Sequence, residues 1–142
     1  MNNPVPPVDL ETEASLLAAP SEDYMSARQL AFFRRRLLGE EQALLAAVKE
    51  TAGHLQQAET SSDWSDRAST EEEHTLELRV RDRERKLLQK IREALRRIDD
   101  GSYGWCEETG EAIGLARLLA RPTAALCLEA QERREQTKRR FA

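Results

Sequence analysis

The sequence is poor in aromatic residues, cysteine and excess positive charge, and each shortage excludes a class of protein. Aromatic residues make up 5% of the 142 residues and charged residues 34%, and the mean hydropathy is -0.69. Such a composition does not fill a thick globular core and is typical of long solvated helices that bury one narrow stripe. The net charge of -4 argues against a protein that coats nucleic acid, because such proteins are normally basic.

Long apolar runs are also missing. No run approaches the length of a membrane span, and the first residues lack the basic start and apolar stretch of a signal peptide. Two cysteines in a chain without these signals suggest a reducing compartment. We therefore expect a cytoplasmic protein, monomeric and without membrane contact.

The charges are segregated along the chain. Acidic residues dominate residues 1–23 and 59–73, whereas residues 79–97 carry nine Lys and Arg against three acids. Blocks of this kind govern docking to a charged partner and say little about fold.

Proline and glycine mark the boundaries of the helical part. Four of the five prolines lie in the first twenty residues, the other is Pro122, and four of the six glycines lie between residues 101 and 114. Nothing between residues 21 and 121 is barred from helix by proline. We expect an irregular acidic arm over residues 1–21, in which residues 13–18 could form a short helix.

Two heptad-like apolar stripes predict a helical hairpin. A first helix, from about residues 21–26 to residue 59, carries its stripe at Leu30, Leu37, Leu44, Val48 and Leu55. A second helix, over about residues 66–100, carries its stripe at Leu76, Val80, Leu87, Ile91, Ala94 and Ile98. A short polar turn between them gives an antiparallel coiled-coil hairpin over residues 22–100, with its tip at about residues 60–68. Helices of this length extend about 50 Å each.

The last part of the chain predicts a small knob. Residues 101–123 are glycine-rich and irregular, and a last helix is expected over about residues 123–141. Because this part has too few apolar residues to fold alone, we expect the N-terminal arm to pack on it. The predicted fold is thus mainly α: a long hairpin (22–100), a zinc-finger-like knob with a C-terminal helix (101–142), and an acidic arm (1–21).

Each of the two cysteines is half of a CxxC pair. Two complete pairs about 20 residues apart would be a strong zinc signal, but Thr109 follows Cys106 and Ala130 follows Cys127 at the second positions. Structural zinc wants four ligands, so two cysteines give either a weak or redox-responsive metal site, or two small buried side chains in a metal-free fold. We favour the metal-free alternative and expect no zinc requirement.

At this point the chain resembles a known family. The segments 66–73 (DRASTEEE) and 76–86 (LELRVRDRERK) resemble the second coiled-coil helix of the DksA/TraR family, and residues 103–106 (YGWC), 110–114 (GEAIG) and 120–124 (ARPTA) resemble its zinc-finger segment. The match is continuous from about residue 63 to residue 132. It implies a non-enzymatic transcription regulator that enters the secondary channel of RNA polymerase, formed by the β and β′ subunits, and destabilises promoter complexes together with guanosine tetraphosphate (ppGpp) in the stringent response.

The resemblance also implies roles for individual residues. It places Asp63, Asp66, Arg67 and Ala68 at the working tip, although the residues alone favour a plain helix N-cap for Asp66 and leave Asp63 open. It implies polymerase-rim contacts for Arg79 and Arg83, and a ppGpp site with Leu87, Lys90 and Arg121. From the residues alone, the basic run that also includes Lys86 could be an ordinary solvated face.

The sequence departs from the family at two places. Gln131 stands where the family often has a lysine, which would alter one phosphate contact. The incomplete cysteine set resembles the cysteine-poor, zinc-independent paralogues that are associated with growth under zinc limitation.

Two alternative functions remain open. A transcript-cleavage factor of the Gre type uses a similar hairpin, but its tip acids are adjacent, whereas Asp63 and Asp66 are three residues apart. A coiled-coil adaptor with an inert tip would also fit the composition. No recognition-helix motif is present, and we expect no sequence-specific DNA binding.

Overall fold

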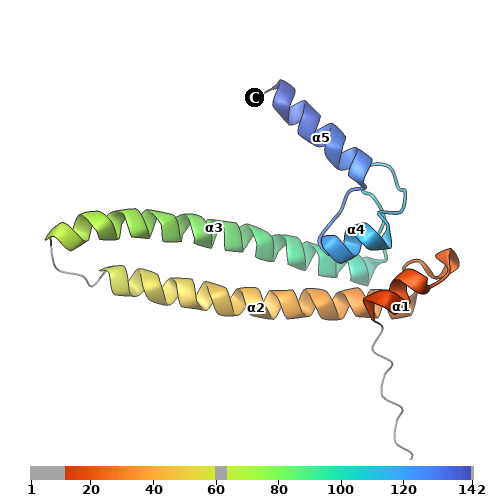
Figure 1. The fold of residues 1–142 in the computed structure, drawn as a ribbon, viewed down its shortest axis with the longest axis horizontal. Helices are drawn as coiled ribbons and strands as arrows, with labels where there is room; N and C mark the ends of the chain where they lie inside the picture. Colours follow the sequence, from red (N-terminus) through yellow and green to blue (C-terminus); the bar gives the residue numbers. More distant parts are fainter. Residues whose placement is uncertain (1–11, 60–63, 142) are drawn as a thin grey trace, which may run out of the picture. The chain divides into compact units, whose positions relative to one another are not determined.

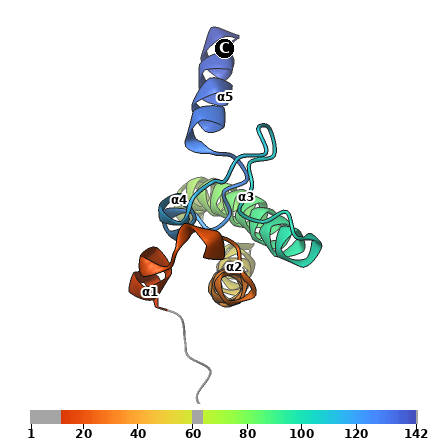
Figure 2. The same ribbon diagram turned by 90° about the vertical axis from the view of Figure 1, so that its right-hand side faces the viewer.

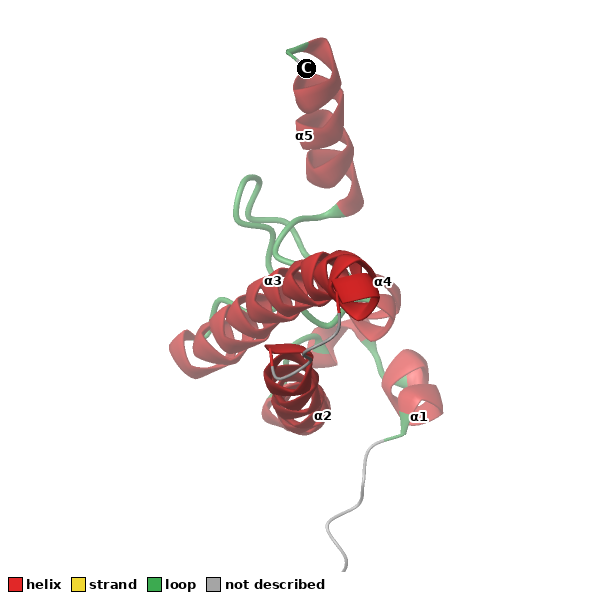
Figure 3. Ribbon diagram, turned by 90° about the vertical axis from the view of Figure 1, so that its left-hand side faces the viewer, coloured by secondary structure: helices red, strands yellow, loops and turns green. Residues whose placement is uncertain are grey.

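The structure is a computed structural model that describes residues 12–59 and 64–141, with side chains described for residues 12–53 and 71–141. Its helices are α1 (Glu13–Ala18), α2 (Ala27–Glu59), α3 (Trp64–Asp100), α4 (Leu115–Ala120) and α5 (Leu128–Arg140), with a short 3-10 helix at Ser21–Asp23 (Figure 1). The described residues contain no strand, only an isolated bridge between Trp105 and Ala112 (Figure 3). The prediction of a mainly helical protein with two long packed helices is confirmed.

Two compact units divide the described chain. One contains the residues up to Leu37 together with those from Glu93 onward, and the other is the stretch Leu38–Arg92 of α2 and α3. In the second unit α2 and α3 run side by side (Figure 1). Among the described residues, no helix is both long and apolar enough to cross a membrane.

The short helix α1 forms at the residues of the arm for which the sequence predicted a possible helix. Thr12 caps it, since its hydroxyl accepts from the Ser15 N–H at 3.1 Å and the Ser15 hydroxyl accepts from the Thr12 N–H at 2.9 Å. Leu16 is fully buried, and α1 contacts α4 (Figure 2). The arm residues that the structure describes therefore belong to the core of the first unit.

Tyr24 ties the chain before α2 to the knob. Its hydroxyl donates to the Gly104 carbonyl at 2.5 Å and accepts from the Gly114 N–H at 2.9 Å. Burial raises the pKa of the Tyr24 phenol, so the hydroxyl keeps the proton that it donates. Gly104 has a φ of 89°, and a Cβ there would lie 2.5 Å from the Met25 sulfur, so only glycine fits this close approach.

The core of the first unit is built around two aromatic rings. Phe33 of α2 and Tyr103 are both fully buried, with ring centroids 5.5 Å apart. The Tyr103 hydroxyl donates to the Pro122 carbonyl at 2.7 Å, which satisfies its polar end inside the core. Other buried side chains of this unit are Leu16, Leu37, Ala94, Ile98, Ile113, Leu118 and Leu126.

The stripe predicted for α2 faces the neighbouring helix. Leu37 is buried, and Leu30, Leu44 and Val48 are half-buried, whereas the side chain of Leu55 lies outside the described residues. Periodicity therefore identified the buried face of this helix correctly over the described part.

The stripe predicted for α3 is correct only near the end of the helix. Ile91, Ala94 and Ile98 are buried, but Leu76, Val80 and Leu87 are exposed. Seven-residue steps back from Ile98 lead through Ile91 to Glu84 and Glu77, and these positions face inward. Glu84 is 9% exposed and accepts a hydrogen bond from the Thr51 hydroxyl of α2 at 3.0 Å. The Thr51 hydroxyl thus satisfies one of the two carboxylate oxygens of Glu84 at this buried position, which the predicted stripe did not include.

The knob contains more helix than predicted. Residues 101–123 were expected to be irregular, but α4 forms within them and buries Leu118. The last helix begins at Leu128, later than the expected residue 123, because the chain first turns back: the Ala124 N–H donates to the Arg121 carbonyl at 3.0 Å. Arg117 stabilises the segment that follows this turn by donating to the Leu126 carbonyl at 3.0 Å.

Candidate functional site

An exposed stripe of apolar and basic side chains runs along α3. Leu76, Val80 and Leu87 are 58%, 47% and 43% exposed, and Arg83 and Lys90 are exposed as well. Spaced three or four residues apart, these five residues lie on one side of the helix. We call them the α3 stripe. Large apolar side chains exposed at helical spacing are typical of a surface that a partner covers.

Local ion pairs leave part of the basic charge of α3 available. Arg85 and Lys86 form ion pairs with Asp82 at 2.7 and 3.0 Å. Both cations lower the pKa of the Asp82 carboxyl, and Lys86 has the larger effect. Arg79, Arg83 and Lys90 form no ion pair with another residue of the described part. Lys86, which the sequence grouped with the basic face, is thus engaged within its own helix.

The predicted tip falls mostly beyond what the structure describes. Asp63 lies outside the described residues, and Asp66, Arg67 and Ala68 lie in the first turns of α3 without described side chains. Their roles stay predictions.

The predicted ppGpp residues are divided between the two units. Leu87 and Lys90 belong to the α3 stripe, whereas Arg121 is exposed at the end of α4 in the other unit. Each unit is described by itself, so their grouping into one site stays a prediction. Gln131 is half-buried and donates to Glu135 at 3.1 Å.

The two cysteines lie on two turns of the knob. The Cys106 N–H donates to the Glu111 carbonyl at 2.7 Å, and the Gly110 N–H donates back to the Cys106 carbonyl at 2.9 Å. Gly110 has a φ of 73°, which closes this turn tightly. Cys127 is the N-cap of α5, and both cysteines are free and buried.

Thr109 contacts both cysteines. Its hydroxyl oxygen lies 3.9 Å from the Cys127 sulfur and accepts from the Glu111 N–H at 3.2 Å. Burial raises the pKa of the Cys106 thiol, but hydrogen bonds from the Thr109 hydroxyl and from the N–H groups of Cys127, Thr109 and Glu108 outweigh it. The pKa of Cys106 is therefore lowered from 9.0 to about 6. The sequence analysis treated Thr109 only as a lost ligand. Its hydroxyl, three residues after Cys106, was the feature that could have predicted a contact with the cysteines.

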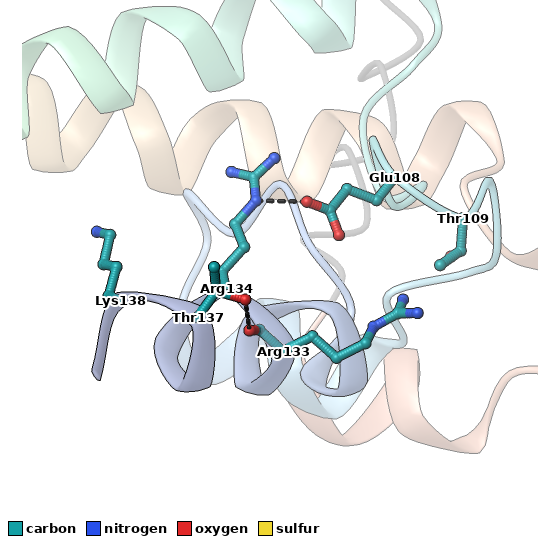
Figure 4. Close-up of a pocket in the computed structure, with 6 residues that line it drawn as sticks. All are labelled: Glu108, Thr109, Arg133, Arg134, Thr137 and Lys138. Carbon is teal, nitrogen blue, oxygen red and sulfur yellow. Dashed lines mark hydrogen bonds and ion pairs between the residues drawn. The ribbon is translucent and has the colours of Figure 1, made fainter. Parts of the chain in front are cut away.

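An open cavity of about 600 Å³ adjoins this turn, lined by Glu108, Thr109, Arg133, Arg134, Thr137 and Lys138. Arg134 forms an ion pair with Glu108 across it, and the Arg133 side chain extends toward Thr109 (Figure 4). Sequence reasoning did not single out this surface, because it joins a loop and a helix about 25 residues apart.

Comparison with known proteins decides the family. A model of the DnaK suppressor protein DksA N-terminal domain matches residues 29–98, and a model of the prokaryotic dksA/traR C4-type zinc finger matches residues 101–136. A relative from Caulobacter vibrioides, named RNA polymerase-binding transcription factor DksA, is 56% identical over 123 residues, which are 84% of this chain and 87% of the relative. The chain belongs to the DksA/TraR family.

Other DksA proteins are also similar to this chain. The Escherichia coli protein, also named RNA polymerase-binding transcription factor DksA, is 49% identical over 111 residues, 78% of this chain and 74% of that protein. The solved structure of transcription factor DksA2 from Pseudomonas aeruginosa matches with a TM-score of 0.84 and 52% identity, covering 90% of this chain and 99% of that one. These relatives are transcription factors, so membership of the DksA/TraR family confirms the expectation of a non-enzyme.

The residues of this DksA/TraR chain do not fit the zinc that a C4 finger holds. Cys106 and Cys127 supply two thiolates, Thr109 supplies a hydroxyl, and Ala130 is fully buried and has no ligand atom. No group of three or more His, Cys, Asp or Glu side chains suited to a metal occurs among the described residues. Structural zinc is almost always held by four N, S or O ligands, so the donor set falls short.

The low pKa of Cys106 gives a prediction for the metal-free protein. Thiolate absorbance should appear with a midpoint near pH 6, and Cys106→Ser should remove this step. Because folding lowers this pKa, the thiolate stabilises the fold fully above the ordinary value of 9.0, and the gain is lost as the pH falls through about 6. The free energy of unfolding should therefore rise between pH 6 and 9 more steeply than in Cys106→Ser. Equal pH profiles would contradict this.

Proposed function

We propose that this chain is an RNA polymerase-binding transcription regulator that enters the secondary channel of the polymerase, between the β and β′ subunits. There its hairpin tip approaches the active centre and destabilises promoter complexes. It acts with ppGpp in the stringent response, in the cytoplasm, and without zinc. The names of its relatives support polymerase binding.

The observation that carries this proposal is the α3 stripe. In an isolated helical hairpin, Leu76, Val80 and Leu87 would pack against the other helix, yet here they are exposed while Glu84 is buried. Burying apolar side chains on binding gains free energy, and the neighbouring Arg83 and Lys90 favour an acidic partner surface. A partner that covers the α3 stripe explains why these side chains stay on the surface.

The tip is tested by Asp66→Asn. If the carboxylate acts in the polymerase active centre, this variant should lose most inhibition of a ribosomal RNA promoter and still bind polymerase, since the amide keeps the shape and the capping ability of Asp66. In vitro transcription together with a polymerase-binding assay measures both. Unchanged inhibition would favour the inert adaptor, and stimulated cleavage of backtracked transcripts would favour a Gre-type factor.

The action with ppGpp is supported by two exposed residues of the predicted site. Leu87 and Lys90 share the α3 stripe, and a lysine ammonium is a suitable partner for a diphosphate. Gln131 carries no charge and is engaged by Glu135. Lys90→Ala should reduce the extra promoter inhibition that ppGpp adds and leave inhibition without ppGpp nearly unchanged. An equal response of both proteins to ppGpp would contradict the role of Lys90.

Zinc independence is tested by metal analysis. Protein purified without chelators should contain no stoichiometric zinc, because two thiolates and a hydroxyl do not complete a four-ligand site. A chelator should leave both promoter inhibition and thermal stability unchanged. One tightly held zinc per chain, or unfolding by the chelator, would contradict the proposal.

A further inference from the structure

The cysteine pair forms a two-sulfur donor set that the polymerase role does not use. Cys106 and Cys127 are 3% and 7% exposed and neither is in a disulfide. They are the only cysteines in the chain. The two cysteines come from different turns of the knob, and the structure shows what lies beside them.

Thr109 and the start of α5 organise the two sulfurs. The Thr109 hydroxyl oxygen lies 3.9 Å from the Cys127 sulfur. The Glu107 N–H donates to the Ala125 carbonyl at 2.9 Å, so the turn that holds Cys106 lies beside the segment that leads to Cys127. Cys127 is the N-cap of a 13-residue helix, but its sulfur makes no capping hydrogen bond and remains available as a ligand.

This donor set selects a class of metal. Soft thiolates without oxygen or imidazole ligands prefer copper(I) and ions like it, which are stable with two sulfur ligands, whereas zinc needs four. Within the described part of the chain no third metal-binding side chain joins the pair, and buried Ala130 occupies the fourth-ligand position with a methyl group. We propose that Cys106 and Cys127 together bind one soft monovalent metal ion of the copper(I) type.

Binding requires no change of oxidation state. Two sulfur–metal bonds form, and a proton that either sulfur still carries passes to solvent. The metal stays monovalent throughout.

Thr109 also links the cysteine turn to the surface. It is exposed and lies in the wall of the cavity of about 600 Å³ (Figure 4). It also lines a second cavity of about 440 Å³, together with Glu111, Glu129, Glu132, Arg133 and Gln136. Three carboxylates against one arginine give this second cavity a negative charge, which attracts cations to the turn.

The experiment uses the full chain, reduced and free of metal, under anaerobic conditions. Silver(I), which is redox-inert, and copper(I) are titrated in competition with a chelator of known affinity. One ion per chain is expected. Cys106→Ser and Cys127→Ser should each weaken binding more than about 100-fold, since even partners outside the ligand shell are worth about 10- to 100-fold. Thr75→Ser, an exposed position on α3 outside the knob, serves as the control and should bind as the parent does.

Several results would overturn the proposal. These are binding that survives in either serine variant, two ions per chain with one at each cysteine, or zinc binding as tight as silver. X-ray absorption of the metal in the parent protein is a second measurement that needs no variant, and it should show two sulfur neighbours. One sulfur, or additional nitrogen and oxygen ligands, would also overturn it. None of these outcomes depends on polymerase binding, so this site is tested independently of the proposed function.

Discussion

Replacing Leu87 with glutamate should weaken polymerase binding by about 30-fold or more while leaving the fold intact. Leu87 lies in the α3 stripe between Arg83 and Lys90, so a carboxylate there would put a charge in the contact and neutralise its basic neighbours. Truncation of a central interface side chain often costs about 2 kcal/mol or more, and about 1.4 kcal/mol corresponds to tenfold in Kd. The new Glu can pair with Arg83 and Lys90 along the helix, which protects its stability.

Leu45→Glu is the matched control for this variant. Leu45 of α2 is 41% exposed, close to the 43% of Leu87, but it lies outside the α3 stripe. It should change the Kd by less than about threefold, because surface substitutions away from a contact stay within about 0.5 kcal/mol. Binding is measured by fluorescence anisotropy with labelled protein, and folding by circular dichroism. Equal weakening by both variants, or no weakening by Leu87→Glu, would place the contact elsewhere.

Phe33→Ala should lower the free energy of unfolding by about 3–5 kcal/mol, the usual cost of emptying a buried phenylalanine site. Phe33 is fully buried and contacts the rings of Phe32 and Tyr103, with centroids 5.3 and 5.5 Å away. Domains of this size are stable by about 5–15 kcal/mol, so the variant should be partly unfolded at physiological temperature. Urea denaturation followed by circular dichroism measures the change.

Phe141→Ala is the control for Phe33→Ala. Phe141 is 86% exposed at the end of α5, so its removal should change the free energy of unfolding by less than about 0.5 kcal/mol. A loss below about 1 kcal/mol for Phe33→Ala would mean that the ring is not part of the core. Comparable losses for both variants would mean that α5 packs far more closely than its exposed side chains indicate.

The hairpin shows what the periodicity of apolar residues can and cannot predict. On α2 the repeat from Leu30 through Leu37 to Leu44 identified the inward face, because the spacing of apolar residues fixes which of them share a side of a helix. On α3 two sets of positions compete, and the apolar one at Leu76, Val80 and Leu87 is exposed. The inward side carries Ile91, Ala94 and Ile98 together with Glu84, which accepts a hydrogen bond from Thr51, 33 residues away in the sequence.

The candidate site, too, could be predicted only in part from the sequence. The sequence identified both cysteines, the incomplete ligand set at Thr109 and Ala130, and the basic run of α3. It did not show that the Thr109 hydroxyl lies beside the Cys127 sulfur or that Lys86 is paired with Asp82. These are statements about distances between side chains, and spacing along the chain does not fix them. The short helix α4 was missed because its six residues lie among glycines and a proline that indicate a loop.

By itself, then, the sequence determined a helical hairpin, a knob without a four-ligand zinc site, and the residues that mark the DksA/TraR family. These follow from local rules: helix periodicity, proline exclusion and the identity of ligand atoms. Only the tertiary structure decided that Leu76, Val80 and Leu87 are exposed while Glu84 is buried, and that Thr109 joins the two cysteines. The physical reason is that contacts with residues far away in the sequence set the rotation of a helix about its axis and the approach of two turns. These contacts together outweigh the hydrophobicity of any single residue.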